Sequence, residues 1–168
     1  MEKRLTHVSS DGQARMVDVG HKPITRRRAV AAGRVLMRPE TLALALSGGG
    51  PKGPVLEVAR LAGVSGAKRT SDMVPLCHPL PIDAVQVEIS ADGTGALAVR
   101  AEVTATWRTG VEMEAFAAVA AAGLTLIDML KAVERELVLS DIRLLHKSGG
   151  RSGDWERAGE PTSEQAGP

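Results

Sequence analysis

Two segments, Val85-Gln-Val-Glu-Ile89 and Leu97-Ala-Val-Arg-Ala-Glu-Val-Thr-Ala-Thr-Trp107, decide the fold class of this chain. In both, apolar residues alternate with polar ones, which is the period of a β-strand with one buried and one solvated face. The stretch Asp92-Gly-Thr-Gly95 supplies a turn between them. The pattern therefore predicts an antiparallel β-hairpin in the middle of the chain.

The segments on either side of the hairpin alternate between extended and helical patterns. Helices that alternate with an antiparallel hairpin predict an α+β fold with the helices packed on one face of the sheet. The split β-α-β-β-α-β arrangement, called ferredoxin-like, matches this order most simply. Extended segments are expected at 16–19, 25–37 and 137–145, helices at 39–47, 55–66 and 111–135, and irregular structure at 1–15 and 147–154.

Length and composition are those of one ordinary globular domain, which we expect at residues 1–154, followed by a disordered tail at 155–168. The 21 Lys and Arg nearly balance the 20 Asp and Glu, so no bulk charge draws the chain to nucleic acid or to a membrane. Aromatic residues are limited to two Trp and one Phe, which counts against a stacking platform for single-stranded nucleic acid.

The cysteine content and the N-terminus predict the cellular compartment. A single cysteine, Cys77, allows no internal disulfide and no Cys-rich zinc site, which favours a reducing cytoplasm. The first residues lack the apolar stretch of a secretory signal, and the weakly polar stretch 115–127 is too short to cross a bilayer. We therefore expect a soluble, cytoplasmic protein.

The long helix carries one carboxylate and one ammonium group, Asp128 and Lys131, inside an apolar run. A spacing of three residues places both side chains on one face of the helix. They could form an ordinary surface ion pair, or a partly buried pair that serves as acid and base because each group tunes the proton affinity of the other. The spacing alone leaves both interpretations open.

Two other motifs have similar alternatives. Glu112 and Glu114 begin the long helix, where they could stabilise the helix dipole or bind a polar heterocycle such as a guanine or pterin edge. His78 lies in the proline-bound loop Pro75–Pro81 and could donate or accept a proton, although an adjacent Cys-His pair is usually structural. The remaining histidines lack metal-ligand spacing, so we predict no metal site.

Several cations lie in or beside glycine-containing loops, as a polyanionic small molecule would require, although each could also be a solvated charge. Glycines let a backbone approach a ligand closely, and lysine supplies a compact charge for phosphate. The loop around Lys52 is not a Walker A motif, because the Gly-Lys-Ser/Thr sequence is absent. The cations are Lys52, Lys68, Arg69, Lys147 and Arg151.

Six motifs, taken together and in order, resemble the cyclic pyranopterin monophosphate synthase (MoaC-type) family over about residues 4–154. The most specific are Pro75-Leu-Cys-His-Pro-Leu80 and Thr109-Gly-Val-Glu-Met-Glu114. The others are Met16-Val-Asp-Val19, Ala67-Lys-Arg-Thr70, Asp128-Met-Leu-Lys131 and Lys147-Ser-Gly-Gly-Arg-Ser-Gly-Asp154.

The resemblance implies a ferredoxin-like lyase of molybdenum cofactor biosynthesis. It implies a homohexamer, built as a trimer of dimers with active sites between subunits. The implied substrate is 3′,8-cyclo-7,8-dihydro-GTP, delivered by an upstream radical-SAM GTP cyclase and converted to cyclic pyranopterin monophosphate and pyrophosphate. Neither a metal nor an organic cofactor is expected, so the protein itself must supply acid, base and anion-stabilising groups.

Residue roles follow from the same resemblance. Asp128 and Lys131 correspond to the central catalytic pair, and Lys52 to a catalytic lysine on a mobile loop. We predict that Asp128 accepts a proton, whereas Lys52 and Lys131 donate protons or stabilise charge, with His78 as a further catalytic residue. The implied substrate contacts are Leu76, Cys77, His78, Glu112, Met113, Glu114, Arg27, Lys68 and Lys147.

The chain departs from the family pattern at Lys52-Gly53-Pro54, where relatives commonly carry Lys-Gly-Asp. A carboxylate is therefore missing, and the glycines at 48–50 predict a flexible loop.

Two other classes of function are compatible with parts of the sequence. An RNA-binding module would use the basic run Arg26–Arg28 but lacks aromatic residues. A non-catalytic scaffold would keep the Ala-rich packing and tolerate substitution of Asp128.

Overall fold

The predicted hairpin is present in the computed structural model, which describes residues 13–160. Strands β2 (Ala84–Ala91) and β3 (Ala96–Trp107) pair antiparallel. The Asp92 carboxylate closes the turn by accepting hydrogen bonds from the amides of Thr94 and Ala96. The odd-numbered residues of β3 from 97 to 105 are buried, whereas the even-numbered residues between them are partly exposed. The prediction of one buried and one solvated face is confirmed.

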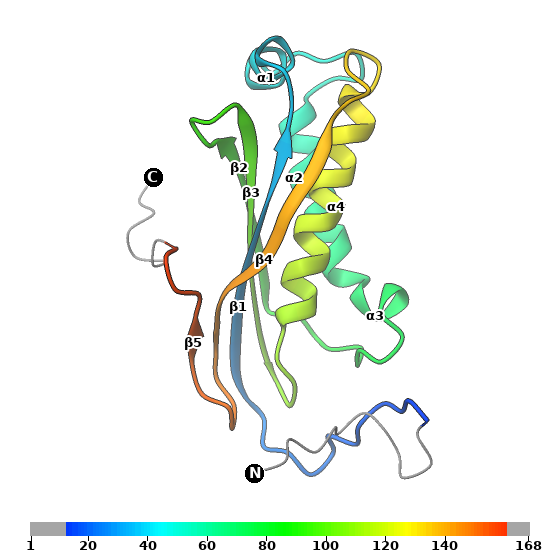
Figure 1. The fold of residues 1–168 in the computed structure, drawn as a ribbon. Coiled ribbons are helices and arrows are strands. Elements are labelled where there is room, and N and C mark those ends of the chain that lie inside the picture. Colours follow the sequence, from blue (N-terminus) through cyan, green and yellow to red (C-terminus); the bar gives the residue numbers. More distant parts are fainter. Residues whose placement is uncertain (1–12, 161–168) are drawn as a thin grey trace.

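The hairpin belongs to a five-stranded antiparallel sheet with the order β2-β3-β1-β4-β5, in which the other strands are β1 (Thr25–Leu36), β4 (Val138–Ser148) and β5 (Trp155–Glu156). Helices α2 (Val55–Lys68) and α4 (Glu112–Leu130) lie on one face of the sheet (Figure 1). The order β1, α2, β2, β3, α4, β4 is the split β-α-β-β-α-β arrangement. The α+β prediction is confirmed.

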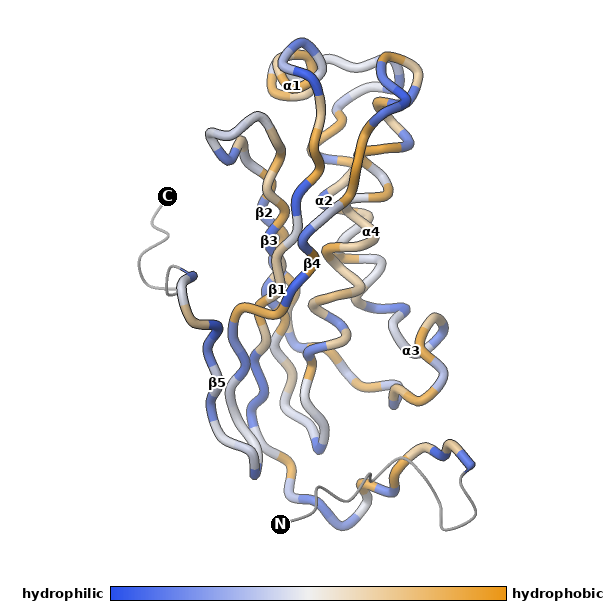
Figure 2. The backbone as a smooth tube through the Cα atoms, in the orientation of Figure 1, coloured by the Kyte–Doolittle hydropathy of each residue, from blue (hydrophilic) through white to orange (hydrophobic). Residues whose placement is uncertain are grey.

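The core between helices and sheet is built from small aliphatic side chains. At Gly66 of α2, an added Cβ would lie 2.5 Å from the Ala121 side chain and 2.8 Å from the Ala117 carbonyl, so the two helices approach too closely for any larger residue. Figure 2 shows α4 as mostly hydrophobic and β5 as hydrophilic. By length and composition α4 could cross a membrane, but it is mostly buried and forms the centre of this core.

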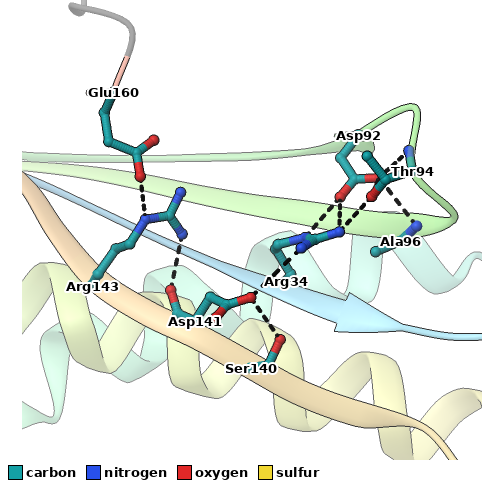
Figure 3. A network of polar contacts seen from close by, with 8 residues as sticks. All are labelled: Arg34, Asp92, Thr94, Ala96, Ser140, Asp141, Arg143 and Glu160. Carbon is teal, nitrogen blue, oxygen red and sulfur yellow. Dashed lines mark hydrogen bonds and ion pairs between the residues drawn. The ribbon is translucent and has the colours of Figure 1, made fainter.

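A polar network ties the far end of the hairpin to β1 and β4 (Figure 3). Arg34 of β1 donates a hydrogen bond from Nε to Asp92 at 2.8 Å and also contacts Thr94. Its guanidinium lies 3.6 Å from Asp141, which has a positive φ of 55° in an irregular stretch of β4. Arg143 then joins Asp141 to Glu160. The network connects three strands on the face that the helices leave open.

Helix α1 (Pro39–Leu46) begins at the predicted residue, and β1 lies where a strand was predicted. The predicted bounds of several other elements were wrong. Residues 16–19 form no strand, and a short helix α3 (Thr70–Met73) was missed. Helix α4 ends at Leu130 because the chain turns so that Glu134 can reach α1.

Strand β4 continues three residues past its predicted end because residues 146–148 pair with β1, and β5 pairs with two of them from the other side. Lys147 is therefore on a strand, and residues 155–156 are not part of a disordered tail. The expectations for residues 1–12 and 161–168 lie outside the described residues.

Candidate active site

The C-terminal end of α4 places Asp128 between two lysines. Its Oδ1 lies 2.6 Å from Lys131 Nζ, and its Oδ2 lies 2.7 Å from Lys52 Nζ. The spacing on α4 accounts for the first contact. The second joins residues 76 positions apart in the sequence, because the loop between α1 and α2 reaches the end of α4. The structure thus brings together three of the four predicted catalytic residues.

This group is exposed, so of the two interpretations of the Asp128–Lys131 spacing the structure shows the surface ion pair and not the partly buried one. The Asp128 side chain is 54% exposed, because Leu126, Met129 and Leu130 take the inward side of the last helical turns. Lys131, and after it Lys52, lowers the pKa of Asp128 to about 2. The carboxylate is therefore ionised at physiological pH and holds both ammonium groups.

The N-terminal end of α4 presents a buried carboxyl group instead. Glu114 is only 4% exposed. Burial, together with the nearby charge of Glu112, raises the pKa of Glu114 to about 7. Burial and the charge of Glu114 also raise the pKa of the Cys77 thiol. Near neutral pH Glu114 is therefore close to half protonated, and Cys77 is less reactive than an exposed thiol.

Glu114 lines a small pocket that includes the His78 side chain and the end of α2. His78 Nε2 lies 2.9 Å from the Val17 carbonyl, which fixes the ring orientation. Lys68, at the exposed end of α2, supplies a cation at the rim. Leu76 is half-buried and Met113 is 39% exposed in the same region. The pocket is lined by Ala67, Lys68, Thr70, Ser71, His78, Pro79, Leu80, Ile82 and Glu114.

Two further cations lie near this end but are engaged differently. Lys147 Nζ donates a hydrogen bond to Ser152 Oγ at 2.7 Å and lies 4.0 Å from Glu112. Arg27 is 9% exposed and donates to the carbonyls of Trp107 and Arg108. Arg27 is buried whereas Arg26 and Arg28 are more exposed, as the alternation of a β-strand requires. Arg27 therefore supports the backbone here, whereas Lys147 is held by Ser152 with its side chain 22% exposed.

Glycine is required where the last loop passes over the start of β1. A Cβ added at Gly149, which has a φ of 89°, would lie 2.1 Å from the Arg26 carbonyl oxygen, a backbone atom that cannot move aside. The sequence motifs did not predict this close approach or the contact of Ser152 with Lys147. The Gly-Gly pair in the motif Lys147–Asp154 was the available signal, because paired glycines mark a close approach or a left-handed turn.

The predicted site residues therefore form two groups at opposite ends of one helix. Glu112 and Asp128 are 16 positions apart on α4, which corresponds to about 24 Å along the helix axis. Lys52 and Lys131 belong to the C-terminal group, which we call the lysine end. Within one chain the remaining predicted site residues gather at the other end, which we call the pocket end: Arg27, Lys68, Leu76, Cys77, His78, Glu112, Met113, Glu114 and Lys147.

Comparison with families of known proteins matches residues 16–150 to the MoaC family. The chain belongs to the MoaC family. Curated relatives named cyclic pyranopterin monophosphate synthase match most of its length. The protein from Chloroflexus aggregans is 53% identical, over 92% of this chain and 94% of its own. Those from Thermomicrobium roseum and Parvibaculum lavamentivorans are each 54% identical, over 91% and 92% of this chain and 93% and 97% of their own.

Proposed function

We propose that this protein is a cyclic pyranopterin monophosphate synthase of molybdenum cofactor biosynthesis. It converts 3′,8-cyclo-7,8-dihydro-GTP to cyclic pyranopterin monophosphate and pyrophosphate, as a phosphorus–oxygen lyase. Family membership supports the assignment, together with relatives of that name at 53–54% identity. The observation that carries the chemistry is the Lys52–Asp128–Lys131 group, which combines one carboxylate and two ammonium groups within hydrogen-bond distance.

The lysine end supplies the proton transfers that rebuilding a purine as a pterin requires. With a pKa of about 2, Asp128 is a weak base while both lysines hold it. It becomes a better proton acceptor when a ligand draws one ammonium group away, because the neighbouring positive charge is what lowers its pKa. Lys52 and Lys131 serve as the proton donors, and they also stabilise negative charge that develops on the substrate.

The pocket end recognises the ligand. A protonated Glu114 can donate as well as accept a hydrogen bond, which suits the edge of a purine or pterin ring. Lys68 and Lys147 supply charge for the phosphates, while Arg27 supports the backbone under them. His78, whose Nε2 lies 2.9 Å from the Val17 carbonyl, transfers a proton within this pocket.

The active enzyme requires more than one copy of the chain. About 24 Å of helix separates the two ends, which is longer than one nucleotide-sized ligand. One bound substrate therefore cannot contact the reacting groups at both ends of the same chain. A partner copy that brings its lysine end to the pocket end of its neighbour completes the site, as in a homohexamer built as a trimer of dimers. Leu61 and Leu124, 70% and 60% exposed on α2 and α4, support a protein contact on the helical face.

The enzyme works in the cytoplasm on a small molecule that a radical-SAM GTP cyclase supplies, and it uses neither a metal nor an organic cofactor. Within residues 13–160, no group of three or more His, Cys, Asp or Glu is arranged to hold a metal ion. We propose that catalysis rests on side chains of the protein, and a chelator tests this directly.

The test is direct conversion of the cyclised GTP by purified protein with chelator present, with cyclic pyranopterin monophosphate and pyrophosphate as readouts. Turnover should persist in chelator and be lost in Asp128→Asn and Lys131→Ala. Glu57→Gln is the matched control, because it removes an exposed i,i+3 ion pair with Arg60 on α2. A folded wild-type protein that forms no product would contradict the assignment and favour a scaffold.

A further inference from the structure

The loop that carries Lys52 is closed by a hydrogen bond between its own residues. The Gly53 amide donates to the Gly50 carbonyl at 3.1 Å, so residues 50–53 form a four-residue turn with Pro51 second and Lys52 third. Among the described non-glycine residues only Asp141 has a positive φ, so Lys52 has the negative φ of a type I turn. Proline is favoured at the second position of such a turn because its ring presets φ.

The turn is also fastened to the start of α2. A Cβ added at Gly50 would lie 2.5 Å from Val55 Cγ2, and Val55 is fully buried in the core. Pro54 joins the turn to the helix with a φ of −72°, and its carbonyl accepts the Val58 amide of the first helical turn. The chain on the C-terminal side of Lys52 is therefore short, restricted and anchored.

This arrangement restricts the conformations of the loop more than its glycines alone would predict. The lysine side chain is 45% exposed, and yet its Nζ lies 2.7 Å from Asp128. Ordering a long lysine side chain has an entropic cost, which is added to any cost of ordering the backbone beneath it. Prolines on both sides remove much of the backbone part, because they restrict the open loop as well as the closed one.

We propose that Pro51 and Pro54 are positioning residues that hold Lys52 against Asp128 before the substrate binds. They lie on either side of Lys52, so that the restriction of the backbone acts directly on the residue that carries the ammonium group. The proposal rests on the proposed catalytic role of Lys52 and Asp128. Its consequence is a lysine loop that enters each turnover already ordered.

The test compares the wild type with a Pro51→Ala/Pro54→Ala variant. Amide exchange of residues 48–54 should become faster, and acylation of Lys52 by a small amine reagent, measured by mass spectrometry, should rise relative to Lys131. kcat should fall by about fivefold to twentyfold, as expected for the loss of two loop prolines, with little change in KM. Pro23→Ala, an exposed loop proline, is the control and should change none of these quantities.

Two comparisons distinguish this proposal from the proposed function. In an Asp128→Asn background, the proline substitutions should no longer change Lys52 acylation, since the partner that they serve is gone. If the wild type makes no product, the proposed function fails, while exchange and acylation still report on the turn. Unchanged acylation of Lys52 in the double variant would overturn the proposal, as would unchanged kcat. Pro51→Ala alone, with about half the logarithmic effect, serves if the double variant does not fold.

Discussion

The two ends of α4 change the pKa of their carboxyl groups in opposite directions. At the lysine end, Asp128 is exposed and lies within hydrogen-bond distance of two ammonium groups, so its pKa falls to about 2. At the pocket end, Glu114 is buried beside another carboxylate, so its pKa rises to about 7. The comparison shows one helix offering a fixed anion at one end and a proton-carrying acid at the other, which are the two kinds of group that general acid–base chemistry requires.

Removing the charge at the lysine end should have the largest effect on activity. In Asp128→Asn, kcat should fall at least about 100-fold, because a general acid–base group typically contributes that much or more. Thermal unfolding should be nearly unchanged, since the side chain is 54% exposed. Steady-state kinetics and a melting curve check both statements. A loss of kcat below tenfold, or a loss explained by unfolding, would contradict the catalytic role.

The pocket end should make stability depend on pH. The pKa of Glu114 rises from its ordinary 4.5 to about 7 on folding, so the folded state keeps a proton that the unfolded chain releases. Stability is therefore highest below about pH 4.5 for this group, falls as pH rises to about 7, and is level above that.

Glu114→Gln should remove this pH dependence. Between pH 4.5 and pH 8 the wild type should lose about 3 kcal/mol of unfolding free energy that the variant keeps, as measured by urea unfolding at fixed protein concentration. Glu112→Gln is the control, with a smaller effect because it removes only the neighbouring charge. Equal pH profiles for the wild type and Glu114→Gln would show that Glu114 is not buried in solution.

A third carboxylate shows that burial alone does not raise a pKa. Glu134 is 4% exposed, and burial opposes its ionisation, but Thr41, together with the amide and guanidinium of Arg38, outweighs that effect and lowers its pKa. The Arg38 amide donates to Glu134 at 3.0 Å and begins α1. Glu134→Ala should therefore cost about 2 kcal/mol of stability at pH 7, because the part-buried hydrogen bond from the Arg38 amide to a charged acceptor is lost. A cost near zero in urea unfolding would contradict this interpretation.

The smallest expected effect is the difference between the two lysines in how far each lowers the pKa of Asp128. Lys131 is the larger cause of the lowered pKa and Lys52 the second. Lys131→Ala should therefore raise the pKa of Asp128 more than Lys52→Ala does, and neither should restore the ordinary value. Carboxyl NMR titration of the two variants measures the difference. A larger rise in Lys52→Ala would reverse the order of the two contacts.

Local patterns predicted the parts of the molecule that local geometry controls. Alternation predicted the hairpin, because the strand period decides which side chains are buried. The i,i+3 spacing predicted the contact of Asp128 with Lys131. The resemblance supplied the roles of Lys52 and His78, which remain proposals.

Other features depend on tertiary packing and could not be predicted from neighbouring residues. The contact of Lys52 with Asp128 joins two elements 76 residues apart. Whether Asp128 or Glu114 is the buried carboxyl depends on which side of α4 meets the sheet and on the loop that covers the pocket. β5 was missed because a two-residue strand has no periodic pattern and forms only by pairing with β4.

The most direct test of the central claim is recovery of activity by mixing two inactive chains, Asp128→Asn and Glu114→Ala. If each active site takes its lysine end from one subunit and its pocket end from another, a mixed pair has one doubly altered site and one intact site. Co-refolded equal mixtures should then regain about a quarter of wild-type conversion, as an isologous pair requires. Mixed oligomers that form, as shown by native mass spectrometry, but give no product would contradict a site shared between subunits.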